Sequence, residues 1–195
     1  MVSYEKVQKA LYRIKQAHEI HGDSIFLGHS GGKDSCVINH LAQRVIPNYK
    51  IVHNVKPILG TSGDPVGALT EMYPSTLEFL YSNVSKQHPV EFLHSSQMPD
   101  YIKRNGLTCQ IDGARIEEHD RPGKSSNIIR NGESVNRKEM TEYEPNGIFG
   151  LAICYPILDW STQDIFDYLV VNYLPFSEEY IENGEYEQFK RCLRN

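Results

Sequence analysis

Ser30-Gly31-Gly32-Lys33-Asp34-Ser35 joins an apolar run to a helical pattern, and this junction is the strongest indication of the fold in the sequence. The apolar run before it, Ser24–His29, has the length of a short strand. The apolar residues after it, within residues 37–46, recur on one face of a helix that Pro47 closes. Where a strand turns into a helix, free N–H groups of the first helical turn converge and the helix dipole favours negative charge. The sequence therefore predicts an anion-binding loop between a strand and a helix.

The residue types in this loop suit a phosphate group. Gly31 and Gly32 let the main chain come close to a phosphate and adopt unusual torsions. The hydroxyls of Ser30 and Ser35 can donate hydrogen bonds to phosphate oxygens. Lys33 adds a positive charge. These five residues are the predicted phosphate contacts.

Asp34 lies in the predicted first helical turn, where a carboxylate suits the helix dipole and is a candidate ligand for a metal ion. Two other phosphate loops fit the sequence less well. The Walker A pattern needs Gly where Leu27 stands and Ser or Thr where Asp34 stands, and the dinucleotide fingerprint GxGxxG does not occur here. His29, next to the loop, is a further candidate donor to a phosphate, although the histidines of the chain form no convincing metal set.

The rest of the chain alternates between strand and helix patterns. Helices are predicted at residues 3–21, 73–84 and 162–172, and strands at residues 50–55, 90–94, 107–112 and 149–155. Ser161 and Asp164 are spaced as a capping box at the start of the last helix. Such alternation predicts an α/β fold with a mostly parallel twisted sheet and helices on both faces, a Rossmann-like arrangement. We expect one domain over residues 1–195, with a polar, flexible loop at about 119–146.

The composition of the chain argues against several classes of protein. The chain has 20 Lys and Arg against 25 Asp and Glu, a net charge of −5, which argues against a general nucleic-acid coat or a membrane-surface protein. No apolar run approaches the ~18 residues that a membrane span needs. The four cysteines are widely spaced and form no CxxC pair, which indicates reduced thiols. We therefore expect a cytoplasmic protein.

Three motifs carry a resemblance to a known family. Ser30–Ser35 is similar to the signature of the PP-loop, or adenine nucleotide α-hydrolase-like, superfamily, whose lysine form occurs in phosphoadenosine phosphosulfate reductases, the small subunit of ATP sulfurylase, and DNA phosphorothioation and tRNA thiolation enzymes. The segment Tyr155–Ser161, followed by Asp164, resembles the Pro-Ile-x-Asp-Trp block of the reductase family. Gly113-Ala114-Arg115 with Glu118 and Arg121 is similar to that family's Gly-x-Arg-x-x-Glu region.

This resemblance implies a site. An adenine nucleotide, either ATP or phosphoadenosine phosphosulfate, would place its phosphates on residues 30–35, with Gly113, Arg115 and Arg121 nearby. A guanidinium pairs bidentately with phosphate or sulfate, so Arg115 and Arg121 are the candidate anion-binding arginines. Lys33, Asp34 and Arg115 are the candidate catalytic residues. If ATP is the substrate, Mg²⁺ is expected, with Asp34 as its candidate ligand.

Cys192 is the candidate nucleophile. The reductases carry a cysteine near the C-terminus within Glu-Cys-Gly-Ile/Leu-His, and here the corresponding stretch is Phe189–Asn195. Neighbouring positive charges favour a thiolate. This chain lacks the family glutamate and the Gly-x-His that follows the cysteine, and it carries Gly60–Asp64 where relatives have Asp-Thr-Gly.

Three functions therefore stay open. In the first, a thiol attacks the sulfur of an adenylyl sulfate and sulfite is released, which calls for a thiol reductant. In the second, ATP is cleaved between its α and β phosphates, an acceptor is adenylated and pyrophosphate leaves. In the third, the chain is a nucleotide-binding partner subunit without catalysis of its own. A homodimer is compatible with each reading, and the sequence offers no support for a nucleic-acid acceptor.

Overall fold

The computed structural model describes residues 1–55, 74–120, 127–130 and 133–176. Five helices are described: α1 (Tyr4–His21), α2 (Lys33–Gln43), α3 (Pro74–Phe79), α4 (Met98–Asn105) and α5 (Thr162–Val171). The described strands are β1 (Ile25–Gly28), β2 (Lys50–Val55), β3 (Val90–His94), β4 (Cys109–Ile111), β5 (Asn127–Arg130), β6 (Glu133–Asn136), β7 (Tyr143–Glu144) and β8 (Ala152–Cys154). A π-helical turn at Leu80–Val84 continues α3, and 3₁₀ turns occupy Ser95–Gln97, Ile116–Asp120, Arg137–Glu139 and Ile148–Gly150.

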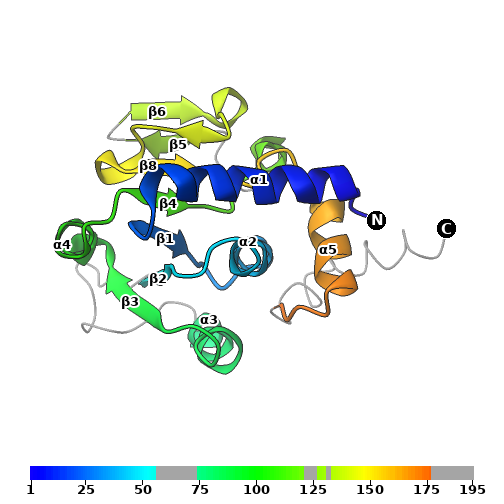
Figure 1. The fold of residues 1–195 in the computed structure, drawn as a ribbon, viewed down its shortest axis with the longest axis horizontal. Helices are drawn as coiled ribbons and strands as arrows, with labels where there is room; N and C mark the ends of the chain where they lie inside the picture. The colour runs from blue at the N-terminus through cyan, green and yellow to red at the C-terminus, as the bar shows by residue number, and fades with distance from the viewer. Residues whose placement is uncertain (56–73, 121–126, 131–132, 177–195) are drawn as a thin grey trace, which may run out of the picture.

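The main sheet has six strands in the order β3-β2-β1-β4-β8-β7 (Figure 1). All neighbours are parallel except the edge strand β7, which runs antiparallel to β8. The chain moves outward from β1 through β2 to β3, then crosses back to β4 on the other side of β1. The predicted α/β fold with a mostly parallel sheet is thus confirmed. The carboxyl ends of β1 and β4 meet at the switch point, where open α/β sheets bind ligands.

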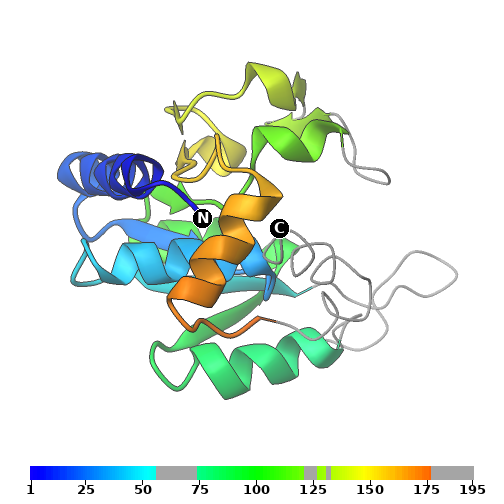
Figure 2. The same ribbon diagram turned by 90° about the vertical axis from the view of Figure 1, so that its right-hand side faces the viewer.

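Helices cover both faces of the sheet, as Figure 1 shows with α4 on one side and α2 and α5 on the other. Alternation along β1 explains the two layers: Ile25 and Leu27 belong to the larger core with α1, α2 and α5. Phe26 points to the opposite face and packs in the smaller core with Tyr101 and Ile102 of α4. Figure 2 shows α5 lying across α2, so the helix that begins at the loop is itself held by a second helix.

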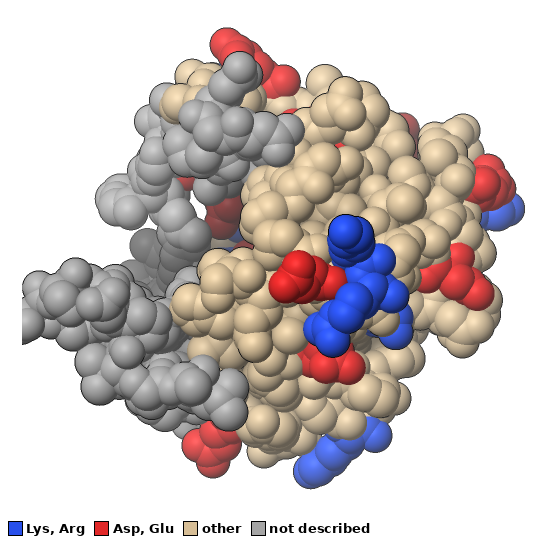
Figure 3. Space-filling view, turned by 90° about the vertical axis from the view of Figure 1, so that its left-hand side faces the viewer, with Lys and Arg blue, Asp and Glu red and all other residues tan. Residues whose placement is uncertain are grey.

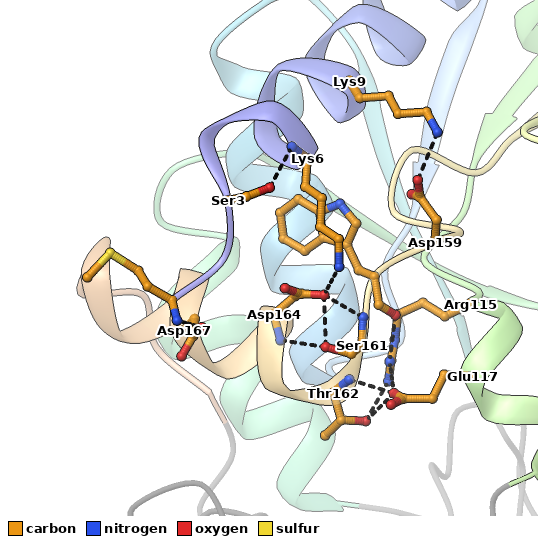
Figure 4. A network of polar contacts seen from close by, with 12 residues as sticks. Ser3, Lys6, Lys9, Arg115, Glu117, Asp159, Ser161, Thr162, Asp164 and Asp167 are labelled. Carbon is orange, nitrogen blue, oxygen red and sulfur yellow. Dashed lines mark hydrogen bonds and ion pairs between the residues drawn. The ribbon is translucent and has the colours of Figure 1, made fainter. Parts of the chain in front are cut away.

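Helix α1 is tied to the segment between β8 and α5. Arg13 is buried and donates from Nη1 to the carbonyl of Pro156 at 2.8 Å and to Oδ1 of Asp159 at 2.7 Å. Lys9 donates to the other oxygen of Asp159 at 2.9 Å, and Lys6 pairs with Asp164 (Figure 4). Burial raises the pKa of the Asp159 carboxyl, but the bonds to Arg13 and Lys9 outweigh it and lower that pKa to about 2. Asp159, singled out by the family resemblance, therefore anchors α1.

One expectation needs correction, and one helix was not predicted. The stretch 119–146, predicted as a polar loop, contains the antiparallel hairpin β5–β6 and the edge strand β7. These strands were not predicted because the stretch is rich in polar residues, and the strands are held by backbone pairing. Helix α4 was missed, because its eight residues are too few for a clear helical period. In contrast, the first helix begins at Tyr4 with Ser3 as its N-cap, and β2 and β3 occupy the predicted residues.

In the described part of the chain, no helix combines the length and the apolar character that a bilayer crossing requires. Figure 3 shows the molecule from the side that carries α4, where Lys and Arg side chains lie beside Asp and Glu side chains. This face therefore presents mixed charge.

Candidate nucleotide site at the β1–α2 loop

The loop Ser30–Ser35 leaves the carboxyl end of β1 and enters α2 at the switch point of the sheet. Its hydroxyls hold the loop itself together. The N–H of Ser30 donates to Oγ of Ser35 at 3.1 Å, and the two hydroxyls pair at 2.9 Å. The N–H of Gly32 donates to Oγ of Ser30 at 3.3 Å. Both serines were predicted to contact a phosphate, and in this structure they shape the loop that would receive it.

Gly31 is required by the shape of the loop. Its φ of 80° lies in the left-handed region, which side chains other than glycine rarely adopt. A Cβ at this position would lie 2.6 Å from Cγ2 of Thr76 in α3. The first turn of α3 therefore packs directly on the loop, and only a glycine leaves room for it.

His29 lies at the start of the loop and is 1% exposed. Its Nδ1 accepts the N–H of Gly31 at 3.1 Å, so the ring proton of the neutral histidine resides on Nε2. Nε2 is buried and has no hydrogen-bond partner among the residues that the structure describes. Burial, and then the neighbouring His53, lower the pKa of His29 to about 3. His29 therefore offers an uncharged N–H donor, and buried donors are rarely left unpaired without a reason.

Helix α2 begins without a side-chain cap. Gly32 is the N-cap and supplies no side-chain hydrogen bond to the first turn. Lys33 follows, 1% exposed, with Nζ 3.5 Å from Oδ2 of Asp34. A helix start with backbone donors and a buried cation beside it is a site for an anion.

Arg115 approaches the loop from the turn after β4. It is 1% exposed, and its Nε donates to Oδ1 of Asp34 at 2.7 Å. Nη1 donates to Oε2 of Glu117 at 2.7 Å and to the carbonyl of Trp160 at 3.2 Å, while Nη2 donates to Oγ1 of Thr162 at 3.3 Å (Figure 4). Burial disfavours the charge, but the carboxylates of Asp34, Glu117 and Glu118 outweigh it and raise the pKa of Arg115.

Gly113 makes this approach geometrically feasible. A Cβ at Gly113 would lie 3.3 Å from the backbone carbonyl carbon and from the Cβ of Asp34. The turn after β4 thus rests directly on the first turn of α2. Gly113 was predicted to contact the nucleotide, and the structure assigns it a packing contact with the loop helix.

The structure brings together most of the predicted site residues. Gly113 and Arg115 meet Lys33 and Asp34 across 81 residues of sequence from Asp34 to Arg115. Arg121 and Cys192 lie outside the described residues.

Three contacts of Arg115 were not foreseen from the sequence. Besides Asp34, Arg115 is bonded to the carboxylate of Glu117, a residue that the sequence analysis did not single out. Thr162 and the carbonyl of Trp160 were also missed, because nothing in a sequence shows that the start of α5 reaches the turn after β4.

The fit to a magnesium ion was tested on the same residues. Oδ1 of Asp34 is bonded to Arg115, and Oδ2 lies near Lys33. Among the described side chains, no three of His, Cys, Asp and Glu gather into a metal site. The described side chains alone do not fit Mg²⁺, which nucleotide phosphates commonly help to hold. Asp34 as a metal ligand stays a prediction.

No family model matches the chain, and no curated protein matches it in sequence. Solved structures with the same fold include a mutant form of the FMN adenylyltransferase of Candida glabrata, with 14% identity and a TM-score of 0.59 over 90% of this chain and 59% of that one. The phosphoadenylyl-sulfate reductase of Candida auris, in a phosphate complex, matches with 9% identity and a TM-score of 0.55 over 94% of this chain and 93% of that one. The NH3-dependent NAD synthetase of Campylobacter jejuni matches with 14% identity and a TM-score of 0.50 over 92% and 76%.

These likenesses concern the fold. The chain spans about three fifths of the length of the FMN adenylyltransferases that it matches. By their names, these similar proteins are an adenylyltransferase, a reductase and a synthetase. The chain therefore shares its α/β fold with these enzymes, and a sequence similar to the PP-loop signature occupies its β1–α2 loop.

Proposed function

We propose that the chain binds an adenine nucleotide, with its phosphate or sulfate end on the β1–α2 loop, and that it is an enzyme acting on that end. The observation that carries the proposal is the start of α2, which lacks a side-chain cap and lies beside the buried Lys33 and His29. Within the described part of the chain, Nε2 of His29 has no hydrogen-bond partner. Preorganised donors of this kind stabilise charge on a phosphoryl or sulfuryl group as it develops. The names of similar structures support the nucleotide: one is an FMN adenylyltransferase with the ATP analogue AMPCPP, another a phosphoadenylyl-sulfate reductase.

The leading chemistry resembles that of the phosphoadenosine phosphosulfate reductases. A cysteine thiolate would attack the sulfur of the adenylyl sulfate, and the bond from sulfur to the nucleotide oxygen would break, so that the nucleotide leaves with that electron pair. A second thiol, from a thiol reductant, would then attack the modified cysteine, releasing sulfite and forming a disulfide. In this reaction Cys192 is the proposed nucleophile.

Adenylation by ATP is the second candidate, because the described cysteines leave the thiol route dependent on Cys192. Cys36, Cys109 and Cys154 are all buried, and burial raises the pKa of Cys36 and of Cys109 to about 12. Burial likewise raises the pKa of Cys154. None of these three thiols suits a nucleophile at neutral pH. Adenylation needs no thiol: the acceptor attacks the α-phosphorus, and pyrophosphate leaves with the electrons of the bond between the α-phosphorus and the bridging oxygen.

Thermal unfolding with nucleotides tests the binding step. A ligand at 100 times its dissociation constant stabilises the folded state by about 2.7 kcal/mol. For a chain of this size, that corresponds to a rise in melting temperature of about 5–10 °C. We expect such a rise with at least one of adenosine 3′,5′-bisphosphate, AMP, and ATP with Mg²⁺, and its loss in Lys33→Met. The control is Lys103→Met, at an exposed lysine of α4, which should keep the shift.

The outcomes separate the proposals. A shift with the bisphosphate alone supports sulfonucleotide chemistry, and a shift with ATP and Mg²⁺ alone supports adenylation. No shift with any nucleotide would contradict nucleotide binding by the chain alone. Full activity of Cys192→Ser on an adenylyl sulfate would contradict the thiol route, while the absence of pyrophosphate release with any acceptor would count against adenylation. Co-purification with a second protein that is required for turnover would favour a partner subunit.

A further inference from the structure

Arg115 is the residue whose place in the structure departs most from its expected role. A guanidinium that grips a phosphate must turn N–H groups toward the ligand. Here all three nitrogens of Arg115 already donate to protein atoms: Nε to Asp34, Nη1 to Glu117 and the Trp160 carbonyl, and Nη2 to Thr162. Each of these hydrogen bonds would have to break before its N–H could turn toward a ligand. A direct grip on the nucleotide would therefore be opposed by the existing bonds.

The acceptors of Arg115 fix it from two sides. Oε2 of Glu117 also accepts from the backbone N–H and from Oγ1 of Thr162, the first residue of α5. Burial raises the pKa of Glu117, but the bonds from Thr162 and Arg115 outweigh it and lower that pKa, so the carboxylate stays charged. Glu117 thus joins the turn after β4 to the start of α5, with Arg115 held between this point and Asp34.

Asp34 is the group for which this arrangement matters. Its carboxylate lies in the first turn of α2, where the anion would bind, and a second negative charge there repels the phosphate. Its two oxygens face two cations, Arg115 at 2.7 Å and Lys33 at 3.5 Å. The shorter contact is the one to Arg115, so Arg115 balances more of the charge of Asp34 than Lys33 does.

We infer that Arg115 is a positioning residue that neutralises and holds Asp34, with Glu117 holding Arg115, so that Lys33 and the start of α2 serve the phosphate. This inference rests on the proposed nucleotide binding and gives Arg115 a role different from direct anion contact. Without Arg115, Asp34 would repel the nucleotide, and its charge would be balanced only by Lys33, to which it already lies at 3.5 Å. Removing the charges of both Arg115 and Asp34 would then restore nucleotide affinity. If Arg115 contacted the phosphate directly, removing Asp34 as well would not restore it.

A double-mutant cycle on nucleotide affinity is the test. Dissociation constants for ATP and for adenosine 3′,5′-bisphosphate are measured by calorimetry in excess EDTA, which keeps a metal ion out of the comparison. The proteins are the wild type, Arg115→Met, Asp34→Asn and the double variant. We expect Arg115→Met to weaken binding about tenfold, because the charge of Asp34 would then act on the phosphate. The double variant should return within about threefold of wild type. A double variant as weak as Arg115→Met, or an Arg115→Met variant of unchanged affinity, would overturn the inference.

A measurement on the wild type guards against a variant that does not fold. In proton–nitrogen spectra, the Nε–H signal of Arg115, assigned with Arg115→Lys, should exchange slowly with water because it is buried against Asp34. It should keep its position when ATP is added, while amide signals of residues 31–35 shift. A large shift or loss of the Arg115 signal on ATP addition would mean that the guanidinium moves to the phosphate. Unshifted loop amides would instead contradict the proposed nucleotide binding, with the Arg115 signal in the free protein still reporting its bond to Asp34.

Discussion

At position 29, a buried histidine has its Nδ1 engaged by the loop and its folded-state pKa lowered to about 3 by burial and then by His53. In the unfolded chain, the same ring takes up a proton below its ordinary pKa of 6.5. The unfolded state therefore binds more protons between these two values, so His29 makes the folded state progressively less stable as the pH falls from about 6.5 to about 3.

The free energy of unfolding should therefore depend on pH differently in the wild type and in His29→Asn. The amide oxygen of the asparagine can still accept the Gly31 N–H. The free energy of unfolding, measured in urea at several pH values from 7 to 4, should fall more steeply with decreasing pH in the wild type. Near pH 5 the gap between the two slopes should approach one proton, or about 1.4 kcal/mol per pH unit. Parallel curves for the two proteins would show that His29 is not held neutral in the folded state.

At the scale of the element, α5 illustrates how a local signal in the sequence becomes part of a larger contact. The side chain of Ser161 accepts the N–H of Asp164, and Asp164 accepts the N–H of Ser161, which is the predicted capping box. Asp164 also pairs with Lys6 of α1, so the cap joins two helices (Figure 4).

Ser161→Ala removes the cap without disturbing the apolar face of α5. We expect the protein to lose about 1 kcal/mol of stability, as is usual for such caps. That loss lowers the melting temperature by about 2–4 °C for a chain of this size. Ser134→Ala, at an exposed serine of β6, is the matched control and should melt with the wild type. Equal melting temperatures for both variants would mean that the cap contributes nothing to stability.

For the whole molecule, the distribution of thiols is a testable property. The buried cysteines Cys36, Cys109 and Cys154, whose pKa values are raised by burial, should resist modification in the native state. Native protein titrated with a disulfide reagent at pH 8 should therefore react rapidly at one thiol at most, and Cys192→Ser at none. In denaturant the wild type should expose all four. Rapid reaction of native Cys192→Ser would contradict the buried placement of the other three.

How far the sequence predicts this molecule depends on the distance between interacting residues. The loop Ser30–Ser35, the strands β2 and β3 and the cap at Ser161 were predictable, because their signals lie within a few neighbouring residues. The short helix α4 and the hairpin β5–β6 were not, since the first is too short for a period and the second is polar.

The same distinction holds for the candidate site, where the residues were predictable and their contacts were not. The sequence identifies Lys33 and Asp34 through the loop and Arg115 through a resemblance, but it says nothing of their mutual contacts. The bond of Arg115 to Glu117 depends on the turn after β4, and the contact with Thr162 depends on where α5 docks. Such details follow from packing between segments that are distant in sequence.

The bridge from Asp34 through Arg115 to Thr162 also has a consequence for the order of events during synthesis. Arg115 follows Asp34 by 81 residues, and Thr162 comes 47 residues later still. A chain made from its N-terminus releases the β1–α2 loop long before the residues that hold it. On the ribosome, the sheet can begin to assemble while Asp34 is still without its guanidinium partner. Competence to bind a nucleotide should therefore come late, when α5 has emerged and docked, and not in proportion to the length of chain already made.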